Sequence, residues 1–145
     1  MKYAHKVKAR VFVKSEEDYS LIKEGLLWLM DVNEPLEKLK YEEEEVTGLE
    51  GESILVINLE IDKNREINDF LKLLKYNLSD EQINYLLKER KPDEKANFFI
   101  RFDKKSVLDK SLELTEDGDC YHIRVSLAAY PSNADTAYGV LEEIF

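Results

Sequence analysis

The sequence is poor in the residues that build disulfide networks and metal centres. It contains one cysteine and two histidines in 145 residues. A lone cysteine, Cys120, cannot form a disulfide within the chain, and the Cys-x-His fragment that it makes with His122 falls short of the ligand set of a zinc site. We therefore expect no internal disulfide, no metal site and no cofactor.

Long apolar runs are also missing. The longest run, from Gly25 to Met30, is far shorter than the roughly 18 residues that suggest a membrane-spanning helix. The start of the chain lacks the apolar segment that is typical of a signal peptide. We therefore predict a cytoplasmic protein that has no membrane role.

Sequence signatures of catalysis are absent as well. No Gly-rich phosphate loop, nucleophile elbow or Walker pattern occurs. Carboxylates are plentiful at Glu42–Glu45 and at Asp117 and Asp119, but the first group is typical of a charged strand or loop and the second of a turn. We predict that the protein is not an enzyme, and a hydrolase that uses these carboxylates is the alternative.

Acidic residues are missing from one stretch, the first 14 residues, although the chain holds 31 Asp and Glu against 21 Lys and Arg. The formal net charge is −10, and an acidic protein repels polyanions at long range. The overall charge therefore gives no argument for a nucleic-acid partner. Only a local cluster of cations, such as the segment Lys6–Lys14, can support one.

The hydrophobic pattern predicts a single α+β domain over residues 1–145. A hydrophobic content of 43% is enough to build a core in a chain of this length. Alternation predicts strands at Tyr3–Val13, Leu36–Val46, Ser53–Ile61, Asn97–Asp103, Leu112–Leu114 and Tyr121–Leu127, whereas helical spacing predicts helices at Ser15–Met30, at Lys63–Lys75, after Ser79 and at the C-terminus. Because hairpins dominate this order, we expect a mostly antiparallel sheet with helices packed on one face.

Capping and turn residues indicate where the predicted helices and strands begin and end. Ser15 with Asp18, and Ser132 with Asp135, have the spacing of capping boxes at the starts of two helices. The segment Glu116–Asp119 contains an Asp-Gly pair, which favours a tight hairpin turn. We therefore predict a hairpin between the strand at Leu112–Leu114 and the strand that follows the turn.

The face of the sheet opposite the helices carries an unusual set of side chains. If the three strands that contribute to it are neighbours, cations and aromatic rings alternate on one open surface. Cations contact phosphates and exposed rings stack on unpaired bases, so this mixture predicts an RNA interface. The residues on this face are Lys6, Lys8, Arg10, Phe12, Lys14, Phe99, Arg101, Cys120, His122, Arg124 and Ser126.

The same residues would also suit roles that involve no RNA. Lysines that alternate along a strand protect a sheet edge from aggregation. Exposed Phe12 and Phe99 would suit a protein interface, most simply a symmetric homodimer, and the acidic residues would suit a basic protein partner. Further basic spots at Lys88–Lys91 and at Lys104 and Lys105 are typical of helix ends that favour cations.

Four segments together resemble a small archaeal family described as predicted RNA-binding exosome subunits. They are ARVFVKSEEDYSLIKEGL, the glycine-bearing loop before ILVINLEI, IRFDKK, and LELTEDGDCYHIRVSLAAYP. The resemblance implies a fold related to the double-stranded-RNA-binding domain and to the ribosomal protein that holds 5S RNA. It also implies a non-catalytic protein that associates with RNA and RNA-processing proteins, with Lys104 and Arg101 in the most recognisable segment. The chain departs from the family pattern in its acidic loop Gly48–Glu52 and in Lys105, which stands where glutamine is frequent.

The sequence thus predicts a protein that binds structured RNA through the open face of its sheet. The alternative is a protein-interaction module that forms a homodimer or binds a basic partner. The residues predicted to contact RNA are Lys6, Lys8, Arg10, Phe12, Lys14, Phe99, Arg101, Lys104, Lys105, His122 and Arg124.

Overall fold

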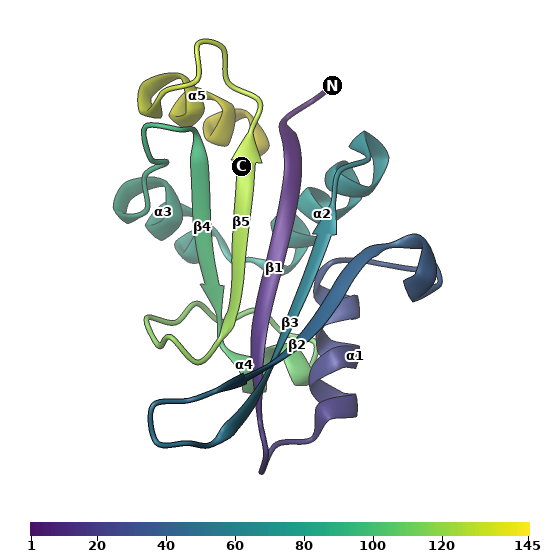
Figure 1. The fold of residues 1–145 in the computed structure, drawn as a ribbon. Coiled ribbons are helices and arrows are strands. Elements are labelled where there is room, and N and C mark those ends of the chain that lie inside the picture. Colours follow the sequence, from purple (N-terminus) through teal and green to yellow (C-terminus); the bar gives the residue numbers. More distant parts are fainter.

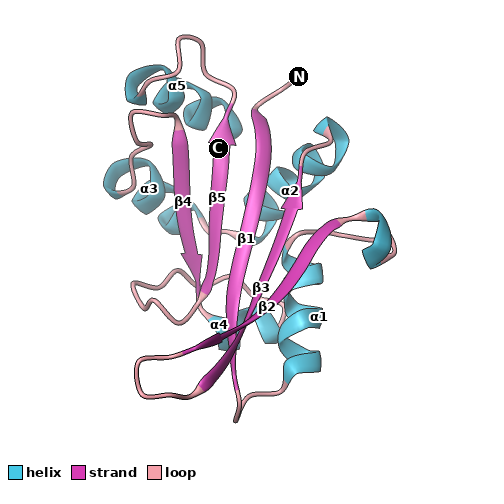
Figure 2. Ribbon diagram, in the orientation of Figure 1, coloured by secondary structure: helices cyan, strands magenta, loops and turns pink.

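A computed structural model describes all of residues 1–145, which form one five-stranded antiparallel sheet and five α-helices (Figures 1 and 2). The elements are β1 (Ala4–Lys14), α1 (Tyr19–Leu29), a short 3-10 turn (Leu36–Lys38), β2 (Lys40–Thr47), β3 (Ser53–Ile61), α2 (Asn64–Asn77), α3 (Asp80–Glu89), β4 (Asn97–Phe102), α4 (Lys104–Leu108), β5 (Tyr121–Leu127) and α5 (Ala134–Ile144). The helices lie behind the sheet in the view of Figure 1. The predicted α+β fold is therefore confirmed.

The strand order is β2-β3-β1-β5-β4, and every neighbouring pair is antiparallel. The first strand of the chain thus lies in the centre of the sheet, between β3 and β5. The strand β5 lies between β1 and β4, so the three strands that carry the predicted basic residues are neighbours.

The hydrophobic core fills the space between one face of the sheet and the helices. Alternate residues of each inner strand point into it, because side chains of a strand alternate between its two faces. Complete burial of a leucine, isoleucine or phenylalanine stabilises the fold by about 1.5 to 3 kcal/mol. The largest fully buried side chains are Tyr121, Phe70, Phe98, Phe102, Leu26, Leu29, Met30, Ile57, Leu59, Ile67, Leu74 and Leu86. No helix combines the length and the apolar character that crossing a lipid bilayer requires.

The start of β1 departs from the predicted alternation. Strict alternation over Tyr3–Val13 places His5 on the face of Val7 and Ala4 on the open side. Instead Ala4 is fully buried and His5 is exposed. The register against β5 shifts between Ala4 and Lys6, and such a bulge reverses which side chains face the core.

The predicted hairpin before β5 is wrong. The partners of β5 are β1 and β4, and the segment at Leu112–Leu114 makes only an isolated bridge between Leu114 and Phe102. The residues before it form α4, which the sequence pattern did not predict because five residues are too few to show a helical period. Asp103 caps this helix by accepting a hydrogen bond from the backbone N–H of Ser106 at 3.1 Å.

Two helix starts are displaced from their predicted caps. Asp18, and not Ser15, caps α1 by accepting a hydrogen bond from the Leu21 N–H at 3.2 Å, and Leu21 is 49% exposed although we expected it on the apolar face. Asn133, one residue after the predicted cap, accepts the corresponding hydrogen bond at the start of α5. Because several residues near each start can cap a helix, composition alone leaves the choice open.

The remaining boundaries agree better with the prediction. The predicted cap Ser79 is confirmed: it forms a complete capping box with Gln82 at the start of α3. The strand β3 has the predicted bounds, whereas β2 begins only at Lys40 because the residues before it form the 3-10 turn that follows Pro35.

The contact between α1 and β5 depends on a glycine. The hydroxyl of Tyr121 donates a hydrogen bond to the Ile22 carbonyl at 2.7 Å, and a Cβ atom at Gly25 would lie 2.6 Å from that hydroxyl oxygen. We predict that Gly25→Ala lowers the free energy of unfolding by about 1 to 3 kcal/mol, because overpacking outweighs the better helix propensity of alanine.

The partner variant Tyr121→Phe removes the clashing hydroxyl at a cost of about 1 kcal/mol for the lost hydrogen bond. Gly25→Ala should therefore cost less in the Tyr121→Phe background than in the wild type, as measured by urea denaturation in a double-mutant cycle. Additive effects, within about 0.5 kcal/mol, would contradict the proposed clash between the new methyl group and the hydroxyl.

Candidate nucleic-acid interface

The antiparallel registers align the predicted basic residues in rows across β1, β5 and β4. The rows lie on the face opposite the helices, where a sheet covered on one side meets solvent. Each row joins side chains from segments that are far apart in the sequence. The three rows are Lys6, Ser126 and Asn97; Lys8, Arg124 and Phe99; and Arg10, His122 and Arg101. We call Lys6, Lys8, Arg10, Phe99, Arg101, His122 and Arg124 the basic face.

The cations of the basic face form no ion pair, although Glu60 of β3 is the cross-strand neighbour of Lys8. None of its lysines and arginines is among the residues that form ion pairs within 4.0 Å. Arg10 donates from Nε to the Asn58 side chain at 3.0 Å, and Arg101 donates from Nη1 to the Glu116 carbonyl at 2.9 Å. Neutral acceptors thus hold two of the guanidinium groups in place without an ion pair. Asn58 was not predicted as part of the site, since the sequence does not show that β3 pairs with β1.

A shallow hollow of about 110 Å³ lies in the centre of the basic face. Phe99 is 40% exposed, and its ring centroid lies 5.7 Å from that of His122 at an interplanar angle of 33°. The hollow is therefore lined by three cationic side chains and two tilted rings. Its lining consists of Lys8, Arg10, Phe99, His122 and Arg124.

The surroundings of His122 favour its neutral form. Burial lowers the pKa of the imidazole below its usual value, and the positive charges of Arg101, Arg10 and Arg124 lower it further. A neutral imidazole can donate a hydrogen bond from one nitrogen and accept one at the other.

An acidic border closes the basic face on the side of β3 and β2. The row that contains Lys8 continues with Glu60 and Lys40, and the row that contains Arg10 continues with Asn58 and Glu42. Within the run Glu42–Glu45, Glu43 and Glu45 lie on the face of β2 opposite to Glu42. Glu43 accepts hydrogen bonds there from the hydroxyls of Tyr19 and Tyr41. The open face is therefore positive over β1, β5 and β4 and negative at the β2 edge.

Two predicted contact residues lie at the margin of the open face. Phe12 is 38% exposed and pairs with Val56 of β3, outside the hollow. Lys14 ends β1 and forms an ion pair with Asp119 at 2.7 Å. Cys120 was expected on this face as well, but it precedes β5 and is only 2% exposed, and burial raises the pKa of its thiol.

Lys104 is buried and lies outside the basic face. Its ammonium group donates to the Phe12 carbonyl at 2.6 Å and to Glu17 at 3.0 Å, and it forms an ion pair with Asp119 at 2.6 Å. With a side chain that is 11% exposed, Lys104 joins the start of α4 to the end of β1. The neighbouring Lys105 is exposed on α4. The prediction grouped these two lysines by sequence, which cannot show that one of them points inward.

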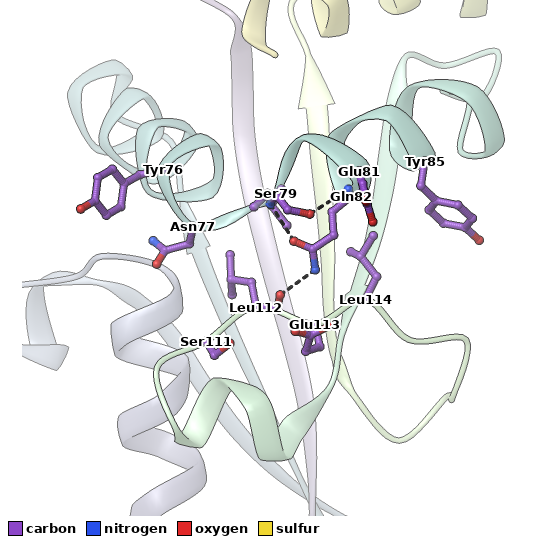
Figure 3. A pocket seen from close by; sticks show the side chains of 11 residues that line it. Tyr76, Asn77, Ser79, Glu81, Gln82, Tyr85, Ser111, Leu112, Glu113 and Leu114 are labelled. Atoms are coloured by element: carbon purple, nitrogen blue, oxygen red, sulfur yellow. Dashed lines mark hydrogen bonds between the residues drawn. The ribbon is translucent and has the colours of Figure 1, made fainter.

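A larger hollow lies elsewhere, between the α2–α3 junction and the segment before β5 (Figure 3). It measures about 750 Å³ and has no basic residue in its lining. In Figure 3 the Gln82 side chain reaches across it, and its Nε2 donates to the Leu112 carbonyl at 2.8 Å. The acidic groups there are Glu81 and Glu113, so this hollow repels a polyanion and does not extend the basic face.

The structure brings together no group of three or more His, Cys, Asp or Glu side chains that could hold a metal ion. The acidic residues predicted as an alternative catalytic set are dispersed. Glu42–Glu45 lie on an edge strand, whereas Asp119 is bound to Lys14 and Lys104.

Comparison with known proteins assigns the chain to a family. Residues 6–127 match the family described as RNA binding, and the chain belongs to that family. An RNA-binding protein from Pyrococcus abyssi is 32% identical over 142 residues, which cover 97% of this chain and 92% of that protein.

Solved structures show the same fold. A DUF54 protein from Methanothermobacter thermautotrophicus superposes with a TM-score of 0.83 at 23% identity, covering 99% of this chain and 98% of that one. A protein from Sulfolobus solfataricus superposes with a TM-score of 0.74 at 18% identity, covering 96% of each chain.

We predict that Lys104→Met lowers the free energy of unfolding at neutral pH by about 2 to 4 kcal/mol. Breaking a buried ion pair costs about 3 to 5 kcal/mol, and the carboxylates of Glu17 and Asp119 are partly exposed here, which reduces the loss. Chemical denaturation measures the effect. The matched control is Lys105→Met on the same helix, which should change stability by no more than about 0.5 kcal/mol.

The loss in Lys104→Met should shrink at acidic pH. Burial acts to raise the pKa of Asp119, but hydrogen bonds from Lys104 and Lys14 outweigh it, so the pKa lies below its ordinary value. A carboxyl whose pKa is lowered by folding stabilises the fold above its unfolded pKa of about 3.9, and this stabilisation is lost as the pH falls through the lower folded value. A loss that stays constant between neutral pH and the range below about 4 would contradict the assignment.

We also predict that NMR titration gives His122 a pKa below the roughly 6.5 of an unperturbed imidazole. Arg10→Gln and Arg101→Gln should each raise this pKa, since each removes a nearby positive charge. Arg65→Gln on α2, outside the basic face, serves as the control and should leave it unchanged. If neither Arg10→Gln nor Arg101→Gln changes the pKa of His122, the guanidinium charges do not contribute to lowering it.

Proposed function

We propose that this protein binds structured RNA through the basic face and does so without catalysis. The observation that carries the proposal is the set of five cations that form no ion pair on three neighbouring strands, in a chain whose net charge is −10. Membership of the family described as RNA binding, and the name of the Pyrococcus abyssi relative, support it.

The positions of the lysines and arginines on the basic face are suited to contact with a phosphate backbone. Uncompensated lysines and arginines displace the counterions that surround RNA, and the release of these ions drives association. The neutral acceptors at Asn58 and Glu116 orient two guanidinium groups before any ligand arrives, so less side-chain freedom is lost on binding. Lys6, Lys8, Arg10, Arg101 and Arg124 are the proposed phosphate contacts.

The acidic border limits the area of the open face that RNA can cover, which we call the footprint. A polyanion that lies over β1, β5 and β4 meets Glu42 and the Glu60–Lys40 ion pair if it extends toward the β2 edge. We infer that RNA lies along the three basic strands and does not extend over β3, where the acidic residues would repel its phosphates. In this arrangement Lys104 has a structural role and Lys105 lies outside the footprint.

The exposed aromatic residues also fit a homodimer, since Phe12 and Phe99 are 38% and 40% exposed. A symmetric dimer through this face would bring the uncompensated cations of two copies close together, and like charges repel. The charge pattern therefore favours RNA over a second copy. A role as an accessory factor in RNA processing stays a prediction from the family resemblance.

The test is fluorescence anisotropy with a labelled RNA hairpin over a salt series. The triple variant Lys6→Glu, Lys8→Glu and Arg10→Glu should bind about 100-fold more weakly at moderate salt, and the salt slope should fall by about 2 to 3 because about one counterion contact is lost at each position.

The matched control carries the same change of charge on the helical side of the molecule, as Arg65→Glu, Lys72→Glu and Lys75→Glu on α2. This control should keep most of the affinity. Equal losses in the two triple variants would show that only net charge matters. Absence of binding by the folded wild type at low salt would overturn the proposal, and solution mass would then test the homodimer.

A further inference from the structure

The hollow in the basic face has an internal organisation that phosphate contact alone does not require. Lys8 and Arg124 are cross-strand neighbours, and Phe99 is the next side chain in the same row. In the adjacent row, Arg10 lies beside His122. Cationic groups and a partly exposed ring are thus separated by a single strand spacing, about 5 Å.

Arg124 is the central group of this arrangement. Its Nε atom is shielded from solvent and has no hydrogen-bond partner. A shielded donor without an acceptor carries a substantial desolvation penalty, and the guanidinium fork matches the oxygens of a phosphate. The other two arginines near the hollow donate to neutral protein acceptors, whereas Arg124 lines the hollow and its Nε atom has no acceptor.

Phe99 supplies a stacking platform beside these donors. Its ring is 40% exposed, although the strand positions on either side of it, Phe98 and Ile100, are buried in the core. The tilted His122 ring fixes one side of the platform, with 5.7 Å between centroids. A base can stack on such a ring only if it is unpaired, because paired bases in an RNA duplex are enclosed in the stack.

We propose that the hollow is a subsite for one unpaired nucleotide of the bound RNA, with the phosphate held by Arg124, Arg10 and Lys8 and the base stacked on Phe99. This inference rests on the proposed function and deepens it, because it names the RNA feature that the basic face selects. The protein then recognises a bulge or a similar extruded nucleotide within structured RNA, and the remaining cations hold the flanking backbone.

The experiment compares two blunt-ended RNA duplexes, one fully paired and one with a single extra unpaired adenosine near its middle. The wild type should bind the bulged duplex about tenfold more tightly, since stacking of one base contributes on that scale. Phe99→Ala should bind both duplexes with the affinity that the wild type shows for the paired one. Phe12→Ala is the matched control, because Phe12 has nearly the same exposure on the same face but does not line the hollow.

Two further variants separate the role of each group from its effect on folding. Phe99→Trp keeps a stacking ring, so it should retain the preference, and its fluorescence should be quenched by the bulged duplex and not by the paired one. Arg124→Lys keeps the charge but loses the planar fork, so it should reduce the preference about fivefold or more while the salt slope stays the same.

The outcomes separate the two proposals. Equal binding of both duplexes, abolished by the triple variant on β1, would leave the RNA-binding function standing and overturn the nucleotide subsite. A bulge preference that survives Phe99→Ala, in protein shown to be folded by thermal melting, would also overturn it. No binding of either duplex would overturn both proposals.

Discussion

The pairing of β1 with β5 is the constraint on which the rest of the structure depends. It joins the first strand of the chain to the last one and fills the centre of the sheet. A slip of one residue in this register would turn every side chain of a strand to the opposite face, exposing Val7 and Ala9 and burying Lys8. The same register therefore sets the composition of the core and the alignment of the cations.

This alignment has an energetic cost. Like charges directly opposite each other in an antiparallel pair destabilise it by a few tenths of a kcal/mol or more, and Lys8 stands opposite Arg124. The protein has 31 acidic residues, but none of them forms an ion pair with Lys8 or Arg124. Local features that oppose stability are expected where a surface serves a ligand, which agrees with the proposed role of the basic face.

The sequence predicted the parts of the fold that local patterns determine. The alternation of β4 and the apolar spacing of α2 indicated their buried faces correctly, because each of these patterns is complete within one element. The basic residues of β1, β4 and β5 were assigned to one face for the same reason. Their adjacency could not be deduced, since strand order arises from packing between distant segments.

The errors have long-range causes too. The bulge near Ala4 depends on the partner strand β5. The local sequence at Glu116–Asp119 favours a hairpin, but β5 pairs with β1 and β4 instead. The role of Lys104 depends on Glu17 and Asp119, which are distant or belong to a separate loop. The sequence around Lys104, which follows Asp103, does not distinguish a buried lysine from an exposed one.

The edge strand β2 has a consequence for self-association. An open edge offers a row of unpaired amides and carbonyls that can template another strand. Glu42 and Glu44 project on one side of this edge and Glu43 and Glu45 on the other, so a second molecule that approached edge to edge would bring glutamate against glutamate on both sides. Molecules gathered at high local density therefore resist merging into a continuous sheet.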